Sequence, residues 1–153
     1  MTLVWHTHSW EEIPKDQWHD CLALRIDIFV VEQECPYSEI DGKDKKSWHL
    51  YATENDVIAA YIRIVPPGIS YEEISIGRVA IAKTYRGKKL GYQLMNRGMD
   101  FIQEKFGEQP IRIGAQQHLR RYYEQLGFAK VSDMYLEDGI PHIDMLFTPT
   151  QSE

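Results

Sequence analysis

Residues 76–95 read IGRVAIAKTYRGKKLGYQLM and contain, in order, the signals of a strand, a turn and the start of a helix. Gly77 to Ile81 predict a strand, with Val79 and Ile81 on one of its faces. A basic turn that contains two glycines, Arg86 to Gly91, follows that strand. This stretch therefore predicts a strand and a helix joined by a basic, glycine-bearing turn.

The helix after the turn is predicted from the spacing of Leu90, Leu94 and Gly98, which fall on one helical face. A strand, a turn and a helix start in this order direct several backbone N–H groups and the positive end of the helix toward one point. An anion at that point, most simply a phosphate, would be stabilised by both.

The charge around this stretch supports an anion site. No Asp or Glu lies between Ile74 and Met99, whereas the whole chain has 23 acidic and 17 basic residues and a net charge of −6. That net charge disfavours nucleic acid as a partner but is compatible with a compact phosphorylated ligand. A solvated turn that carries basic residues remains the alternative. The basic residues in the stretch are Arg78, Lys83, Arg86, Lys88, Lys89 and Arg97.

Length and composition predict one domain that spans residues 1–153, with 43% hydrophobic and 26% charged residues. No run of about 18 apolar residues predicts a membrane span, and the first residues lack the pattern of a secretory signal. Cys21 and Cys35 show no pairing pattern, so both are expected to be reduced. We therefore expect a cytoplasmic protein without a membrane partner.

The remaining secondary structure is predicted from periodicity and turn signals, and it gives an α+β chain with a mixed sheet. Glu54-Asn55-Asp56 and Glu137-Asp138-Gly139 are typical of hairpin turns, and residues 68–73 predict a mobile loop. Besides the strand at 77–81, strands are predicted over residues 3–8, 47–53, 57–65, 111–115, 128–136 and 142–148. Helices are predicted over residues 14–29, 90–106 and 116–125.

Three features of the first half leave alternatives open. Arg25 lies on an apolar helix face, where its stem could pack on the core with its head at the rim, or its head could bind a ligand. The acidic segment Val30–Lys46 could be a solvated loop or a wall that attracts an amine. His6 and His8 share one face of the first strand, but without a carboxylate or thiol pattern we favour an edge strand over a metal site.

Two motifs resemble the GNAT acetyltransferases. Arg86-Gly87-Lys88-Lys89-Leu90-Gly91 is similar to the family's acyl-CoA pyrophosphate loop, Arg/Gln-x-x-Gly-x-Gly/Ala, with Lys89 in place of the first motif glycine. The Lys89 backbone N–H remains available if this residue keeps a negative φ. The second motif, Tyr122 to Phe128 (YYEQLGF), matches the family's aromatic-Tyr-x-x-x-Gly-Phe segment throughout.

Further strings are similar to the ElaA-type branch of the family, and together the resemblance covers nearly the whole chain. They stand at Phe29–Tyr37 (FVVEQECPY), Ile40–Gly42 (IDG), Gly77–Val79 (GRV), Ala115–Leu119 (AQQHL) and Glu137–His142 (EDGIPH). The resemblance implies the GNAT fold, a mixed and mostly antiparallel sheet of six to seven strands flanked by about four helices. It also implies transfer of the acetyl group of acetyl-CoA to a small-molecule or peptide amine in a ternary complex, without a metal, by a protein that could be a homodimer.

The resemblance also implies roles for particular residues. Tyr123 corresponds to the general acid that meets the CoA sulfur, although a helix tyrosine packed beneath the cofactor is the alternative. Backbone and side-chain groups that would bind acetyl-CoA belong to Val79, Ala80, Ile81, Arg86, Gly87, Lys88, Lys89, Leu90, Gly91 and Tyr92. The general base and the acceptor amine stay open; the candidates for the base are Glu32, Asp41, Glu73, His118, Glu137 and His142.

Two other classes of function compete with an acetyltransferase. One is a non-catalytic acyl-CoA-binding sensor or interaction protein that kept the fold, and such a protein would not need Tyr123. The other is a nucleotide-phosphate binder, which would require the G-x-x-x-x-G-K-[ST] loop that the sequence lacks. Cys35 as an acetylated nucleophile is a further mechanism, but no nearby pattern would activate its thiol.

Overall fold

The computed structural model describes residues 1–149, which form eight strands and three α-helices. The strands are β1 (Val4–Ser9), β2 (Trp48–Glu54), β3 (Val57–Val65), β4 (Ile74–Ile81), β5 (Ile111–Gln116), β6 (Phe128–Lys130), β7 (Tyr135–Glu137) and β8 (Ile140–Phe147). The helices are α1 (Lys15–Ile26), α2 (Leu90–Phe106) and α3 (Arg120–Gln125). A π-helical turn, η1 (Asp27–Glu32), extends α1, and η2 (Asp44–Lys46), η3 (Lys83–Tyr85) and η4 (Gln117–Leu119) are single 3₁₀ turns.

The α+β class and the mixed sheet are confirmed, whereas the predicted six to seven strands and about four helices are wrong in number. The segment predicted as one strand over residues 128–136 forms two strands, β6 and β7. Between them the Ser132 side chain, rather than a backbone carbonyl, accepts the hydrogen bond of the Asp144 N–H at 2.8 Å, which interrupts the ladder with β8. The helix predicted over residues 116–125 is shorter because Gln116 still belongs to β5 and η4 precedes α3.

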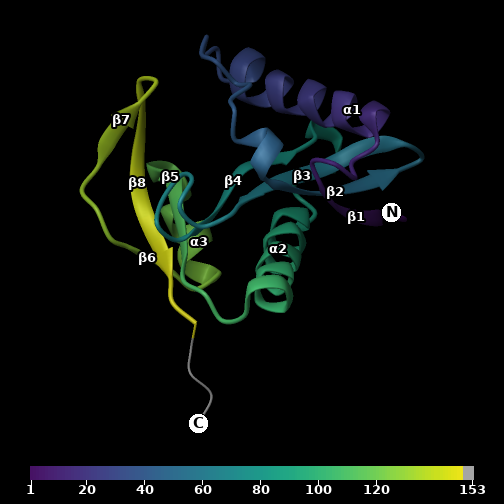
Figure 1. Cartoon of the computed structure of the whole chain (residues 1–153). Coiled ribbons are helices and arrows are strands. Elements are labelled where there is room, and N and C mark those ends of the chain that lie inside the picture. Colours follow the sequence, from purple (N-terminus) through teal and green to yellow (C-terminus); the bar gives the residue numbers. More distant parts are fainter. Residues whose placement is uncertain (150–153) are drawn as a thin grey trace.

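The sheet consists of two halves that meet over a short distance. Its strand order is β1-β2-β3-β4-β5-β8-β6, with β7 also on β8. Only the β4–β5 pair is parallel, and it is limited to Ile74 with Ile111 and Ser75 with Arg112. Beyond these residues β4 and β5 diverge, so that β1–β4 lie on one side and β5–β8 on the other (Figure 1). The rest of β4 therefore lacks a β5 partner.

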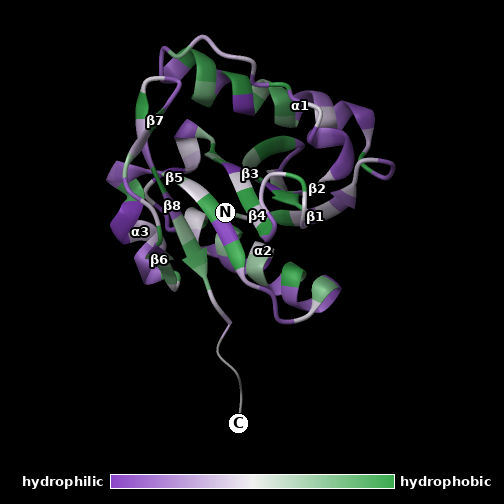
Figure 2. Ribbon diagram, turned by 60° about the vertical axis from the view of Figure 1, so that its left-hand side comes forward, coloured by the Kyte–Doolittle hydropathy of each residue, from purple (hydrophilic) through white to green (hydrophobic). Residues whose placement is uncertain are grey.

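Helices cover both faces of the sheet. In Figure 1, α1 lies on one side of β2–β3 and α2 on the other, and Figure 2 shows apolar and polar segments alternating along α1. Gly98 lets α2 approach β3 closely, since a Cβ at this position would lie 2.5 Å from Ile62 Cδ1. None of the helices within residues 1–149 combines the length and the apolar character needed to cross a bilayer.

The β2–β3 hairpin is confirmed, and its turn explains why. Asn55 and Asp56 have φ values of 50° and 65°, the left-handed conformation that a two-residue turn of type I′ requires at both positions. Asn and Asp tolerate this conformation better than most residues. The hairpin places His49 of β2 and Arg63 of β3 next to each other under α1.

We predict that His49 makes the fold sensitive to acid. Its buried ring donates from Nε2 to Asp44 O (2.9 Å) and accepts from the Tyr61 hydroxyl at Nδ1 (2.6 Å), and burial lowers its pKa from 6.5 to about 4. Between these two pH values His49 binds a proton in the unfolded chain but not in the folded chain. Stability present above pH 6.5 is therefore lost as the pH falls toward 4, by about 3 kcal/mol. Denaturant unfolding at several pH values should show a shallower loss for His49→Gln; equal slopes would contradict the prediction.

Candidate active site

The loop between β4 and α2 presents free backbone N–H groups. Gly87 and Lys89 both have left-handed backbone, with φ values of 79° and 59°. No side chain caps α2, and across the described part of the chain the N–H groups from Gly87 to Tyr92 donate to no backbone carbonyl. Alternating left-handed residues form a concave nest of N–H groups, and here the nest coincides with the start of a 17-residue helix. The geometry suits a phosphate or diphosphate.

The backbone conformation of Lys89 differs from the one predicted from the sequence. We expected this residue to tolerate the loss of the motif glycine by keeping a negative φ, but its φ is +59°. The left-handed conformation brings Cβ close to the backbone, which is why glycine usually occupies such positions. Lys89 thus adopts the backbone of a glycine at an energetic cost, and its N–H stays in the nest.

A Lys89→Gly variant should therefore be more stable than the wild type. Removing Cβ relieves a conformation that costs a non-glycine residue roughly 1–2 kcal/mol, partly offset by the extra freedom of glycine in the unfolded chain. We expect a gain of about 0.5–1 kcal/mol, measured as a rise of about 1–4 °C in melting temperature. Gly107→Ala, which forces a side chain into a left-handed position with φ +80°, should lower it. A lower melting temperature for Lys89→Gly would disprove the strain.

The three cations of the loop differ in their partners. The Arg86 guanidinium donates to both carboxylate oxygens of Glu32 at 2.8 and 2.9 Å, and its Nε donates to Ile81 O at 3.1 Å. Lys88 and Lys89 have exposed side chains, with Lys88 Nζ 5.7 Å from the Tyr85 ring. The two lysines are therefore the loop cations with free reach toward a phosphate, while Arg86 connects the loop to η1.

Tyr123 lies in a cluster of aromatic rings beneath the loop. It is 7% exposed, and burial raises the pKa of its hydroxyl, with Tyr122 adding to the effect. The Tyr122 ring lies 4.9 Å from that of Tyr123 and 4.8 Å from that of Tyr92 at the start of α2. The Tyr122 hydroxyl is buried without a partner in the described structure, 2.7 Å from the Cβ that a side chain at Gly91 would have. Gly91 is thus required for α3 to pack against the start of α2.

A bulge in β4 lies beside the point where β4 and β5 separate. On β3, Tyr61 pairs with Ala80 and Arg63 pairs with Gly77, so β4 has one more residue than β3 in this interval. Arg78 is that irregular position and has a φ of 52°. The backbone of Val79 and Ile81, which the resemblance places along the pantetheine arm, follows directly and has no β5 partner. The bulge sets the direction of these groups.

The second part of the acidic segment after α1 turns inward, whereas Glu32 and Glu34 stay exposed. Arg25 is completely buried rather than having its head at the rim. Its Nε donates to Glu39 at 2.6 Å and its Nη1 to Asp44 at 2.8 Å. Arg63 likewise donates to Asp41 at 2.7 Å and Asp44 at 3.0 Å. Glu39, Asp41 and Asp44 therefore neutralise buried arginines, and only Glu32 and Glu34 of the segment remain as acids that face solvent.

The base candidates differ in what surrounds them. Arg86 lowers the pKa of Glu32, and Arg63 and Arg78 outweigh burial to lower that of Asp41, so both carboxylates are committed to arginines. Glu73 lies 3.8 Å from Arg112, and His118 is exposed. The structure brings the remaining two together: His142 and Glu137 approach to 3.5 Å, and His142 Nδ1 donates to Ile140 O at 2.7 Å. Nε2 is the ring nitrogen that faces the Glu137 carboxylate.

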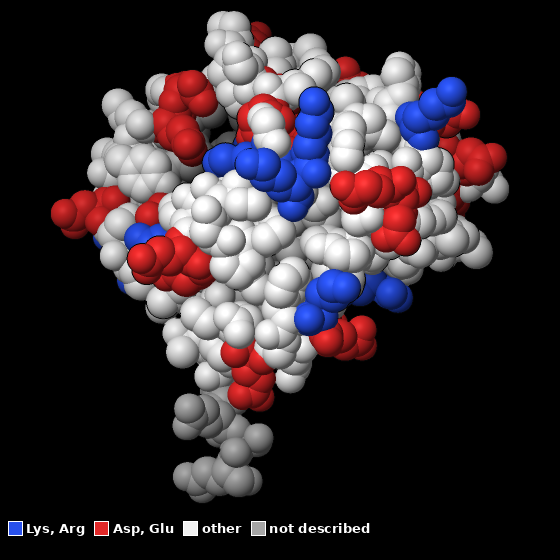
Figure 3. All heavy atoms as spheres, viewed as in Figure 1, with Lys and Arg blue, Asp and Glu red and all other residues white. Residues whose placement is uncertain are grey.

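A hollow opens between the β7–β8 side and the segment after α1, with acidic and basic side chains around it (Figure 3). Two contacts connect its sides: Gln116 Nε2 donates to Gln33 Oε1 at 3.4 Å, and Cys35 Sγ donates to Asp138 O at 3.5 Å. Since Glu32 holds Arg86, the end of η1 contacts both the loop after β4 and the end of β5. The end of η1 thereby bridges the split between the halves of the sheet.

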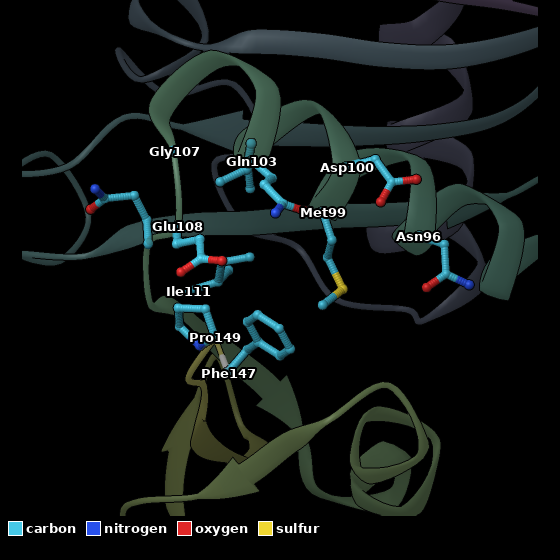
Figure 4. Close-up of a pocket in the computed structure, with 11 residues that line it drawn as sticks. Asn96, Met99, Asp100, Gln103, Gly107, Glu108, Ile111, Phe147 and Pro149 are labelled. Atoms are coloured by element: carbon cyan, nitrogen blue, oxygen red, sulfur yellow. The ribbon is translucent and has the colours of Figure 1, made fainter. Parts of the chain in front are cut away.

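A second depression, of about 220 Å³, lies at the other end of α2. Met99, Gln103, Ile111 and Phe147 line it together with the acidic side chains of Asp100 and Glu108 (Figure 4). No Lys or Arg is among its lining residues in the described structure. Its charge disfavours phosphate, so the nest at the start of α2 remains the better candidate for an anionic ligand.

His6 and His8 lie on β1, which is the end strand of the sheet. The predicted edge strand is confirmed. His6 Nε2 is 2.9 Å from Thr53 Oγ1, and the His6 ring stacks on Tyr51. Across residues 1–149, no three His, Cys, Asp or Glu side chains gather as a metal site would require. Cys21 and Cys35 are both free and buried.

Comparison with known proteins decides the family. A model of the acetyltransferase (GNAT) domain matches residues 21–148. The chain belongs to the GNAT acetyltransferase family. Among GNAT relatives, protein ElaA of Escherichia coli (strain K12) is 39% identical over 145 residues, which cover 94% of this chain and 95% of ElaA.

Solved structures agree with this GNAT assignment. The crystal structure of Escherichia coli ElaA gives a TM-score of 0.90 at 37% identity and covers 95% of this chain and 99% of that one. That of an acyl-CoA N-acyltransferase from Pseudomonas aeruginosa gives 0.92 at 37% identity and covers 96% and 100%. The predicted GNAT fold and the resemblance to the ElaA-type branch are thus confirmed.

Proposed function

We propose that this GNAT protein is an acetyl-CoA-dependent N-acetyltransferase that acetylates a primary amine by direct attack in a ternary complex. The observation that carries the proposal is the nest of free N–H groups at the start of α2, which the packed rings of Tyr92 and Tyr122 connect to the buried Tyr123. An anion site beside a proton donor suits a phosphorylated donor with a thiolate leaving group. Acetyl-CoA is such a donor, since it supplies an acetyl thioester at the end of a diphosphate-bearing arm.

The residues present fit acetyl-CoA. The N–H groups from Gly87 to Tyr92 would hold the diphosphate, with Lys88 and Lys89 adding charge. The part of β4 without a β5 partner, Val79 to Ile81, leaves backbone groups free to bind the amides of the pantetheine arm. Gly91 keeps the helix start free of a side chain, and Leu90 anchors it in the core.

Tyr123 would act as the general acid. Its raised pKa keeps the hydroxyl protonated at neutral pH, so that it can donate its proton to the departing thiolate. The attacking amine must be neutral, and its proton needs an acceptor. His142 with Glu137 is the candidate that the geometry favours, because Ile140 O holds Nδ1 and the Glu137 carboxylate 3.5 Å from Nε2 would stabilise a proton taken up there.

The acceptor is proposed to be the amine of a small molecule or a peptide, bound in the hollow beside β7–β8. Glu137 and Glu34 are exposed around this region and would favour a cationic amine on approach. The enzyme would act without nucleic acid or a membrane as partner, as a monomer or a homodimer. Two free cysteines fit a cytoplasmic enzyme.

A screen for thiol release tests this function. Purified protein is incubated with acetyl-CoA and a panel of polyamines, amino acids, aminated metabolites and peptides, and free CoA is followed with a thiol reagent. At least one amine should raise CoA release well above the rate without amine, and mass spectrometry should show an acetylated product. Binding of acetyl-CoA without release for any member would favour a non-catalytic sensor instead.

A further inference from the structure

The ion network under α1 contains a contact that no part of the proposed chemistry uses. Arg78, at the β4 bulge, has left-handed backbone with a φ of 52°, although it is not a glycine. A non-glycine residue in this conformation persists only when its surroundings hold it there, and such residues gather at functional sites. The question is therefore what holds Arg78.

The Arg78 side chain is fixed by the segment after α1. Its Nε lies 2.8 Å from Glu39 Oε1, and its Nη2 donates to Glu39 O at 3.3 Å and to Asp41 Oδ2 at 3.4 Å. The Tyr37 ring lies 5.8 Å from the guanidinium carbon, and the Tyr37 hydroxyl donates to Glu39. The guanidinium thus has four groups around it, all from residues 37–41.

The two acids that hold Arg78 are themselves anchored. Arg25 of α1 binds Glu39, and Arg63 of β3 binds Asp41, both through short hydrogen bonds. Asp44 connects Arg25 to Arg63 at 2.8 and 3.0 Å and makes no contact with Arg78. The partners of Arg78 therefore belong to a buried ion network that extends from α1 to β3.

We propose that Glu39 and Asp41 are positioning residues for the thioester: by holding Arg78 they fix the β4 bulge and so aim the Val79–Ile81 backbone at the acyl group of acyl-CoA. This inference rests on the proposed function, since it presumes that acyl-CoA binds along β4. The residue after a bulge changes direction with it, so releasing Arg78 would turn the Val79 N–H away from the split between β4 and β5. An N–H directed at a carbonyl oxygen is the kind of group that stabilises negative charge developing there.

The test compares backbone amide signals of ¹⁵N-labelled protein with saturating acetyl-CoA and with saturating CoA. The two ligands differ only in the acetyl group, so the difference spectrum reports which N–H groups sense the thioester carbonyl. In the wild type, a downfield shift specific to acetyl-CoA should appear within Val79–Ile81. Arg78→Gln and Glu39→Gln should each remove it while both ligands still bind.

Asp44→Asn is the matched control. It removes a buried carboxylate from the same network and should lower the melting temperature about as much as Glu39→Gln, yet it leaves every contact of Arg78 in place. The acetyl-specific shift should survive in this variant. Arg78→Gln guards against misfolding of the buried variants, because the Arg78 side chain is 23% exposed.

Each outcome decides the inference. It is overturned if the wild type shows no acetyl-specific shift in Val79–Ile81, if Arg78→Gln or Glu39→Gln keeps that shift, or if Asp44→Asn loses it to the same extent. Failure of the proposed function looks different. If acyl-CoA does not bind along β4, neither CoA species changes any amide signal, and if it binds without transfer, the thiol-release screen finds no accepted amine while the acetyl-specific shift persists.

Discussion

Replacing Tyr123 by phenylalanine should lower the rate of acetyl transfer about 10²-fold or more and leave the affinity for acetyl-CoA unchanged. A positioned general acid typically contributes about 10²–10⁴-fold, and the Tyr123 hydroxyl is the group proposed to supply the proton. The ring itself, which packs against Tyr122 and Phe128, stays in place in the variant. Initial rates with the best amine of the screen and calorimetric titration with acetyl-CoA measure the two quantities.

Tyr122→Phe is the matched control for this prediction. It removes a hydroxyl from the neighbouring ring, and that hydroxyl is buried without a partner in the described structure. Deleting an unsatisfied buried group should leave the rate within about twofold and make the protein slightly more stable. Equal rates for Tyr123→Phe and the wild type would rule out the general-acid role, and a large loss in Tyr122→Phe would assign the effect to packing.

The pH dependence gives a further sign of Tyr123. Burial raises its pKa above the usual value near 10, so the hydroxyl keeps its proton throughout the neutral range. Between pH 8 and 10 the wild type and Tyr123→Phe should therefore show the same pH dependence of the rate. A decline seen only in the wild type would contradict this expectation. Such a decline would mean that the hydroxyl ionises at or below its ordinary pKa.

Replacing Arg25 by methionine should lower the free energy of unfolding by about 3–5 kcal/mol, the largest stability effect that we predict. The change leaves Glu39 and Asp44 buried, with Glu39 still beside Arg78 and Asp44 beside Arg63. The cost comes from carboxylates that have lost a partner in a site of low polarity, not from lost packing, since methionine fills a similar volume. Denaturant unfolding measured near neutral pH gives the value.

Arg97→Met serves as the comparison for Arg25→Met. Arg97 is exposed on α2 and lies 4.4 Å from the Trp5 ring centroid, an exposed contact whose loss should cost less than about 1 kcal/mol. A cost below about 1 kcal/mol for Arg25→Met as well would mean that the buried network contributes little to stability.

The surroundings of Arg25 could be predicted from the sequence only in part. The helix that carries Arg25 was predicted from its periodicity, because the apolar face repeats locally. The complete burial of the Arg25 guanidinium was not predicted. It depends on the carboxylates of Glu39 and Asp44, which are 14 and 19 residues away and fold back toward α1. Arg63 and Glu39 were missed for the same reason. The available signal was an acid-rich segment together with one arginine on the apolar face of a helix and another inside an apolar strand.

The site shows the same limit. The strand, turn and helix of the anion loop were predicted because their signals lie within twenty consecutive residues. The bulge at Arg78 and the left-handed Lys89 were not, since neither residue type favours a positive φ and tertiary contacts hold the first of them. The approach of His142 to Glu137 depends on the register between β7 and β8, which brings two of the base candidates together in a way that their positions alone do not indicate.

A thermal-shift titration with acetyl-CoA, run beside CoA and ATP, tests most directly whether the loop at the start of α2 binds acyl-CoA. At about 100 times its Kd, a ligand adds roughly 2.7 kcal/mol, which corresponds to several degrees for a domain of this size. We predict saturable shifts with acetyl-CoA and CoA and none of that size with ATP. The absence of a shift with both CoA species would contradict the account.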